Sequence, residues 1–142
     1  NRDWFIAEIS VLIAGYVAEK MKFGVTSSGV SSDFQHAMRL AHFAIWKLGM
    51  GKSESLGDYT SIPADQLSES VKEKLNAETH DLIQACMKSV EDLLKKENVI
   101  FERFANELIA RLELDYDDIE AIFKEYGKPN PRDTAKYIPK TT

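Results

Sequence analysis

Apolar residues recur at helical spacing through most of the chain and begin almost at its first residue. From Trp4 to Val17 they cover nearly the whole circumference of one predicted helix, a distribution that is typical of a buried helix. Gly15 inside this helix costs roughly 1 kcal/mol relative to alanine, so we expect a neighbouring backbone to approach closely there. The helix is predicted to end near Lys22, with Gly24 as its C-terminal stop.

Ten small or polar residues, 24–33 (GVTSSGVSSD), separate this helix from the next one. A loop of this composition needs no core of its own, so its predicted role is to hold Asp33, its last residue, in a fixed position. Ser32 and Gln35 have the spacing of a capping box, which predicts that the second helix begins with Ser32 as its N-cap.

Four helices are predicted after this loop. The second ends at Gly49 and Gly51, and a third, starting near Pro63, continues for about thirty residues. Asn98 is placed to cap a fourth helix and Asp115 a fifth. The predicted inner residues are Phe34, Ala37, Met38, Ala41, Ile45 and Leu48, then Leu67, Val71, Leu75, Leu82, Cys86, Val90 and Leu93, then Phe101, Phe104, Leu108 and Leu112, and last Ile119, Ile122 and Phe123.

No long alternating pattern indicates a strand, so the predicted fold class is all-α. We expect a five-helix domain with one long helix and a small-residue loop between the first and second helices. The predicted boundaries are residues 1–126 for the domain and 127–142 for a polar C-terminal tail.

The composition adds a few limits to this picture. With 142 residues, 44% hydrophobic and 29% charged, the chain falls in the range of one globular domain. Its net charge of -5 argues against nucleic acid as a partner. Cys86 is the single cysteine, lies on an apolar stripe, and is predicted to pack in the core. The chain starts with Asn1 and not with methionine, which we interpret as a piece of a longer protein whose missing part is N-terminal.

Residues 9–24, ISVLIAGYVAEKMKFG, resemble the IAVLLGGRxAEExxFG segment of the FtsH family, the membrane-anchored AAA+ zinc proteases. The loop at residues 25–33, VTSSGVSSD, is similar to the VTTGASND turn of that family. The closing segment at 114–119, LDYDDI, resembles the last helices of the family's protease domain. The resemblance covers roughly residues 3–126.

The chain departs from the family pattern at several positions. Tyr16 stands where the family has arginine, Lys20 where it has a second acidic residue, and Ser32 where it has asparagine. The HExxH motif of the family is absent, because none of the three histidines has that spacing. In the family this motif, the AAA+ module and the membrane segment all lie upstream of the matching region.

The resemblance implies that the parent protein is an ATP-dependent zinc metalloendopeptidase that degrades proteins. Two histidines one helical turn apart hold zinc in this family, with the intervening glutamate as base. The third zinc ligand is the aspartate of the loop, which corresponds to Asp33 here. No catalytic and no cofactor-binding residue is assigned to this chain, and ATP belongs to the missing AAA+ module.

The resemblance also implies a location and partners. The parent protein is expected at the cytoplasmic face of the bacterial inner membrane, or its organellar equivalent, as a homo-oligomer that forms a hexamer. The membrane is expected to be reached only through the missing N-terminal segments, while the 142 residues themselves are expected to be soluble and inactive alone. The helices after Leu67 are expected to help pair protomers.

Several alternatives stay open from the residues alone. Asp33 has the position of an acidic residue that complements the helix dipole, at about 0.3–1 kcal/mol, or of a zinc ligand. Glu19 is interpreted as a support for the zinc site or as a salt-bridge partner at the helix end, and His36 as a surface or supporting residue. A second hypothesis is a non-catalytic helical interaction module derived from such a protease, which Tyr16 and Lys20 favour.

Overall fold

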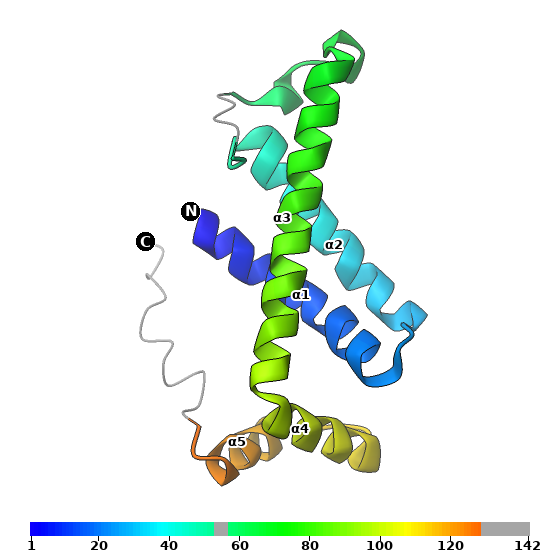
Figure 1. Cartoon of the computed structure of the whole chain (residues 1–142), viewed down its shortest axis with the longest axis vertical. Coiled ribbons are helices and arrows are strands. Elements are labelled where there is room, and N and C mark those ends of the chain that lie inside the picture. Colours follow the sequence, from blue (N-terminus) through cyan, green and yellow to red (C-terminus); the bar gives the residue numbers. More distant parts are fainter. Residues whose placement is uncertain (53–56, 129–142) are drawn as a thin grey trace. The chain divides into compact units, whose positions relative to one another are not determined.

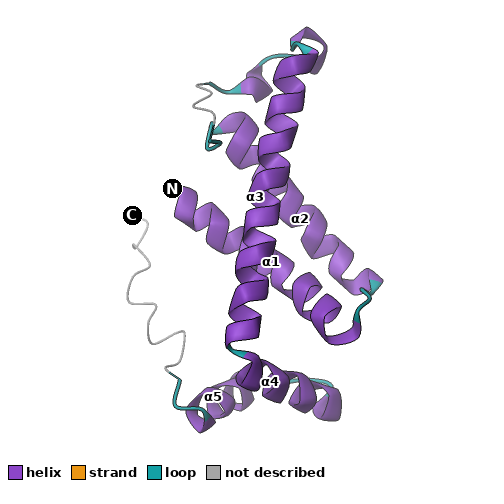
Figure 2. Cartoon of the chain, in the orientation of Figure 1, coloured by secondary structure: helices purple, strands orange, loops and turns teal. Residues whose placement is uncertain are grey.

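The computed structural model describes residues 1–52 and 57–128, and in these residues every regular element is helical (Figure 2). The all-α prediction is therefore confirmed. The chain forms two compact units, residues 1–93 and 94–142. The α-helices of the described part are α1 (Arg2–Phe23), α2 (Ser31–His42), α3 (Glu69–Lys96), α4 (Asn98–Arg111) and α5 (Tyr116–Glu125). The expected tail at 127–142 stays a prediction, because residues 129–142 lie outside the described part.

Helices α1 and α2 lie side by side and run in opposite directions in the first unit (Figure 1). The buried side chains of α1 follow one face of the helix: Phe5, Ile9, Ile13 and Val17. Burial around nearly the whole helix was expected, and this is wrong, since Trp4 is 53% and Val11 72% exposed. The neighbouring helices of this unit cover only one side of α1.

The second helix begins directly after a short 3₁₀ turn, η1 (Ser28–Val30). The predicted capping box is wrong, because α2 starts at Ser31 and no side chain caps its first turn. Instead, the Ser31 hydroxyl donates a hydrogen bond to the Ser28 carbonyl at 2.8 Å. The 3₁₀ turn thus leads straight into the helix, and Ser32 lies inside it.

A π-helical turn, η2 (Phe43–Lys47), extends α2. Here the Leu48 N–H donates to the Phe43 carbonyl at 3.2 Å, five residues back. This wider turn was not predicted. Small residues form most of the buried face of α2 and η2, which consists of Ala37, Ala41, Ala44 and Ile45. Met38 and Leu48, expected inside, are exposed by 39% and 43%.

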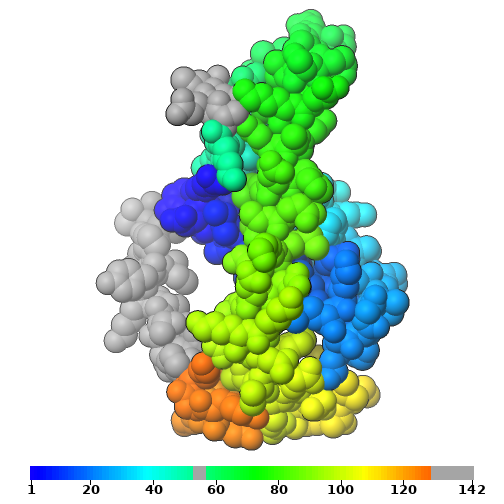
Figure 3. Space-filling view, in the orientation of Figure 1, coloured from blue at the N-terminus to red at the C-terminus, as the bar shows by residue number. Residues whose placement is uncertain are grey.

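The long helix α3 crosses over α1 and α2 (Figures 1 and 3). It begins at Glu69 and not near Pro63, since residues Ala64–Gln66 form a separate 3₁₀ turn, η4, and Leu67 is extended. The buried residues of α3 are Leu75, Thr79, Leu82, Ile83, Cys86 and Val90.

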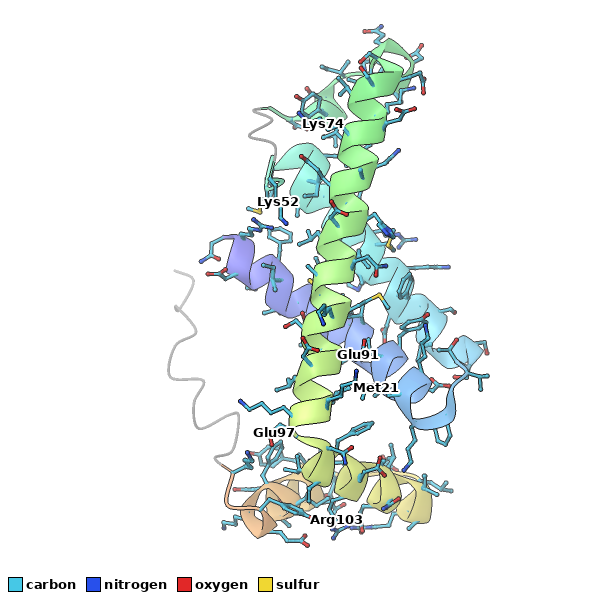
Figure 4. The ribbon with its side chains drawn as sticks, in the orientation of Figure 1. Met21, Lys52, Lys74, Glu91, Glu97 and Arg103 are labelled. Carbon is cyan, nitrogen blue, oxygen red and sulfur yellow. The ribbon has the colours of Figure 1, made fainter. Side chains whose placement is uncertain are left out.

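The prediction that Cys86 packs in the core is confirmed, because its side chain is 1% exposed, and this burial raises the pKa of the thiol. Figure 4 labels Met21 of α1 and Glu91 of α3, which line one cavity of about 310 Å³.

Helices α4 and α5 form the second unit. The Phe104 and Phe123 rings meet edge to face at 5.3 Å, and the buried residues of the two helices are Ile100 and Ile122. Leu108 and Leu112 were expected inside, but they are exposed by 48% and 86%. Asn98 is the first residue of α4 and not its cap.

The start of α5 is held by the predicted aspartate cap. Asp115 accepts a hydrogen bond from the Asp118 N–H at 2.9 Å, and Asp118 accepts one from the Asp115 N–H at 3.1 Å. Arg111 adds an ion pair to Asp118 at 2.8 Å. Asp115 and Asp118 therefore form a reciprocal capping box, and Arg111 at the end of α4 pairs with one of its carboxylates.

The second unit is expected to lose stability in acid. The Asp115 N–H and then Arg111 hold the pKa of Asp118 below its ordinary value of 3.8. The folded state therefore binds fewer protons than the unfolded chain, so stability is present above that value and is lost as pH falls through the lowered pKa. Between about pH 5 and pH 3, urea unfolding followed by circular dichroism is expected to show a falling free energy of unfolding.

Asp118→Asn is expected to flatten part of this dependence on pH. The matched control is Asp117→Asn, because the exposed Asp117 side chain makes no hydrogen bond or ion pair to a described residue. An Asp118→Asn variant with the wild-type pH slope would show that the capping box and ion pair do not form in solution.

Candidate metal-ligand site at the start of α2

The loop between α1 and α2 begins with a glycine stop. Gly24 adopts a left-handed conformation with φ of 72°, and its N–H donates to the Lys20 carbonyl at 2.8 Å. Glycine adopts such a backbone without the steric cost of a Cβ atom. The predicted end of α1 at this residue is confirmed, and the chain turns back here toward α2.

Contacts with α1 fix the loop and the first turn of α2. The Ser27 N–H donates to the Glu19 carboxylate at 2.7 Å. The rings of Tyr16 and Phe34 lie 5.2 Å apart at an angle of 48°. Because Phe34 follows Asp33 directly, these contacts hold the backbone on both sides of the loop that delivers the Asp33 carboxylate.

Gly15 contributes less to this packing than its position in a helix indicates. A Cβ atom at Gly15 would lie 3.9 Å from the Val30 side chain, an ordinary van der Waals distance. The expectation that a close backbone approach requires glycine here is therefore wrong, because alanine fits the space.

Asp33 is the third residue of α2 and is exposed. Its carboxylate makes no hydrogen bond or ion pair with any residue that the structure describes. The position complements the partial positive charge of the helix N-terminus. The carboxylate oxygens also remain open to a cation from outside the described residues, so the geometry is compatible with both interpretations of Asp33.

The other titratable residues do not complete a metal site around Asp33. Within residues 1–52 and 57–128, no group of three or more His, Cys, Asp or Glu side chains is placed to hold a metal ion. His36, one helical turn after Asp33, is exposed. A carboxylate oxygen is a suitable zinc ligand, but a site needs more than this one.

Glu19 has a role that the sequence did not indicate. It was interpreted as a support for zinc or as a salt-bridge partner, and the structure shows it as the acceptor for a loop N–H. Tyr16 was interpreted as a departure from the family pattern that favours a non-catalytic module, yet its ring packs on Phe34. Both roles depend on how the loop folds back over the last two turns of α1, which helical periodicity does not reveal.

The sequence of the chain matches the model of Peptidase family M41 over residues 1–122. The chain belongs to this family. ATP-dependent zinc metalloprotease FtsH 4 of Sorangium cellulosum is 31% identical over 135 residues, which are 86% of this chain and 21% of the relative. FtsH of Pelodictyon phaeoclathratiforme is 28% identical over 92% of this chain and 22% of the relative. FtsH 1 of Thermomicrobium roseum is 29% identical over 93% of this chain and 22% of the relative.

The FtsH resemblance is thereby confirmed, and the chain spans about a fifth of the length of these curated relatives. Among the helices of residues 1–52 and 57–128, none combines the length and the apolar character that crossing a membrane requires.

Glu19→Ala is expected to loosen the loop before α2. A hydrogen bond to a charged acceptor contributes on the order of 1 kcal/mol in a partly exposed setting, which corresponds to about a fivefold change in an equilibrium. Amide hydrogen exchange at Ser27, measured by NMR, is therefore expected to become about fivefold faster. The control is Glu8→Ala, an exposed acidic residue on the same helix. Unchanged exchange at Ser27 would show that Glu19 does not hold the loop.

Proposed function

We propose that this chain is the part of an FtsH-type zinc peptidase domain that supplies Asp33 as the third protein ligand of a catalytic zinc ion. The observation that carries the proposal is the state of the Asp33 carboxylate. It is exposed and has no partner among the described residues, while its backbone is held by the contacts of α1 with Ser27 and Phe34. A ligand that is positioned by its backbone and left open at its oxygens needs little reorganisation to bind a cation.

The chemistry of the donor is consistent with zinc. Catalytic zinc sites use three protein ligands from His, Asp and Glu and leave the fourth position for water. When bound, zinc lowers the pKa of that water and polarises a carbonyl group. The proposed role of this chain is to orient one carboxylate oxygen of Asp33. Glu19 and Tyr16 act as positioning residues, because they hold the loop and the first turn of α2.

We propose that the other two zinc ligands and the general base lie outside these 142 residues, in an HExxH motif like that of the FtsH family. The uncovered side of α1 supports this, because Trp4 and Val11 expose apolar surface there. The AAA+ module that uses ATP and a membrane segment are likewise proposed for the parent protein only. The same proposal implies that the parent protein acts on protein substrates.

The departures at Tyr16 and Lys20 favoured a non-catalytic module as the second candidate. The Tyr16 ring, however, contributes to the packing that holds the start of α2. Lys20 lies with its Nζ 6.0 Å from the centre of that ring. A changed residue that still supports the backbone around Asp33 is compatible with a working ligand site, so we favour the peptidase.

In full-length protein, Asp33→Ala is expected to reduce bound zinc and ATP-dependent casein degradation at least tenfold, since one of three ligands is lost. The double variant with Asp33→Ala and Ser32→Asp returns a negative charge to the first turn of α2 but not to the ligand position. It is expected to recover the thermal stability of the helix start but neither zinc nor activity. Zinc content is measured by plasma mass spectrometry.

Retained zinc in Asp33→Ala, or recovery of zinc in the double variant, would reduce Asp33 to a residue that complements the helix dipole. As a further control, the isolated 142-residue chain is expected to show no chelator-sensitive casein hydrolysis, because the HExxH residues are absent from it. Such hydrolysis would contradict the proposed division of the site.

We also propose that α4 contributes to contacts between protomers of the parent oligomer. Leu112 ends α4 with a φ of 65°, a left-handed conformation that costs a non-glycine residue roughly 1–2 kcal/mol. Its side chain is 86% exposed, and Leu108 and Ile109 expose apolar surface beside it on α4. The strained leucine stabilises nothing by burial within its own unit, which supports a contact with another protein surface.

Leu112→Asn separates the backbone strain from the loss of exposed apolar surface. Asparagine removes the apolar side chain but adopts the left-handed conformation more readily than leucine. The variant is expected to keep the thermal stability of the chain while weakening self-association of the full-length protein in sedimentation velocity. Ala110→Asn, at an exposed position about half a turn away on α4, is the control. Oligomers as stable in Leu112→Asn as in the control would exclude this surface from the protomer contact.

A further inference from the structure

A groove lies between α2 and α3 in the first unit, at the opposite end of α2 from Asp33. Its volume is about 590 Å³, within the range of sites that bind small molecules or peptide side chains. From the α2 side it is lined by Met38, Arg39, His42 and Phe43. Their spacing places them on one face of the helix at its last turn.

The opposite wall comes from α3 and from the 3₁₀ turn η3 (Tyr59–Ser61). Asn76, Thr79 and His80 line it from α3, and Thr60 lines it from η3. The Thr79 hydroxyl donates to the Leu75 carbonyl at 2.8 Å, so its proton is used within α3. The walls therefore combine apolar surface with threonine and asparagine side chains, two imidazole rings and one guanidinium group.

The apolar part of the groove is uncovered in this unit. Met38, which was predicted to lie inside, is 39% exposed, and Phe43 is 40% exposed. Methionine adapts its shape to different apolar partners. The Phe43 ring stacks on Phe5 at 6.1 Å and has the Lys47 Nζ 5.3 Å from its centre, so its exposed part adds apolar surface beside a second cation. These two side chains can take up an apolar side chain of a ligand.

The polar part of the groove is cationic in character and has no acidic lining residue. Arg39 is exposed and makes no ion pair with any residue in the described part of the chain. The nearest carboxylate along η3 is that of Asp58, which already accepts hydrogen bonds from the Thr60 N–H at 3.0 Å and from the Thr60 hydroxyl. Because the whole chain carries a net charge of -5, an uncompensated arginine beside two histidines is a local exception.

The π-helical turn that follows α2 shapes this side of the groove. It begins at Phe43, and it holds Trp46 against His42, with the two rings stacked 4.7 Å apart at 15°. The imidazole is thereby fixed at the edge of the groove. Single π-helical turns are frequent at functional sites, and here the π-helical turn follows α2 directly beside the exposed arginine and phenylalanine.

These features restrict what can occupy the groove. The lining residues do not fit a metal ion, because two histidines without a carboxylate do not complete a metal site. No group of three or more His, Cys, Asp or Glu side chains in the described residues is placed to hold one. A small inorganic anion would leave the apolar wall uncovered. The C-terminal tail 129–142 has the wrong charge, with three basic residues and one acidic residue in its sequence.

We propose that this groove is a docking site for a short protein segment that carries acidic and apolar side chains in alternation. Its carboxylates pair with Arg39 and the neighbouring histidines, and its apolar side chains pack on Met38 and Phe43. The site is separate from Asp33 and goes beyond the proposed zinc ligation. In a protease it would give protein substrates a second point of attachment.

The test uses the full 142-residue chain and a fluorescein-labelled peptide, Asp-Leu-Glu-Phe-Asp-Leu-Glu, in fluorescence anisotropy without added zinc. Saturable binding is expected that weakens as salt is raised, since charge pairs at a partly exposed groove are screened. The charge-swapped peptide Lys-Leu-Arg-Phe-Lys-Leu-Arg is expected not to bind in this way. Absence of saturable binding below about 1 mM, near the weakest affinity of a specific site, or equal binding of both peptides, would overturn the proposal.

The variant Arg39→Glu is expected to weaken binding of the acidic peptide at least about tenfold, which is about 1.4 kcal/mol. Lys74→Glu is the matched control, because it changes the net charge equally from a position on α3 that does not line the groove (Figure 4). Circular dichroism confirms that both variants are folded. Equal weakening in the two variants would indicate a general charge effect and would overturn the assignment to this groove. No step of this test depends on zinc, so its outcome is independent of that for Asp33.

Discussion

The packing of α1 against α2 is the constraint on which the first unit depends. The contact consists of large apolar side chains from α1, such as Ile9 and Ile13, against alanines of α2, such as Ala37 and Ala41, and all four are fully buried. Small side chains let two helix backbones approach closely, and filling the remaining space with isoleucine gives dense packing. This contact sets where both ends of α2 lie, and the candidate sites are at those ends.

At its first turn, α2 carries Asp33, and the loop before it is tied to α1 by Glu19 and Tyr16. The position of the Asp33 carboxylate is thus set by the backbone on either side of it, and its own oxygens make no hydrogen bond to a described residue. At its last turn, α2 passes into a π-helical segment beside an open groove. One helix therefore presents two surfaces of different chemistry, an isolated carboxylate at the N-terminal end and a cationic, apolar groove at the C-terminal end.

The inner faces assigned from periodicity were correct where another helix of the same unit covers them. They were wrong where apolar side chains are exposed, at Val11 on α1, Met38 on α2, Leu48 after η2, Leu93 on α3, and Leu108 and Leu112 at the end of α4. Periodicity reports which face of a helix is apolar, but it does not report which partner buries that face. The match to relatives about five times longer is consistent with partners outside these residues.

The sequence by itself determined the all-α class, the glycine stop after α1, the aspartate cap of α5 and the family, because each depends on residues close together along the chain. It also brought Asp33 forward as the candidate ligand. Tertiary structure alone decided that α2 begins without a capping box, that Glu19 bonds to the loop backbone, and that Arg39 and His80 share one groove. The physical reason is that backbone donors and side chains from distant segments meet only after α1, α2 and α3 have packed, and no local pattern encodes that meeting.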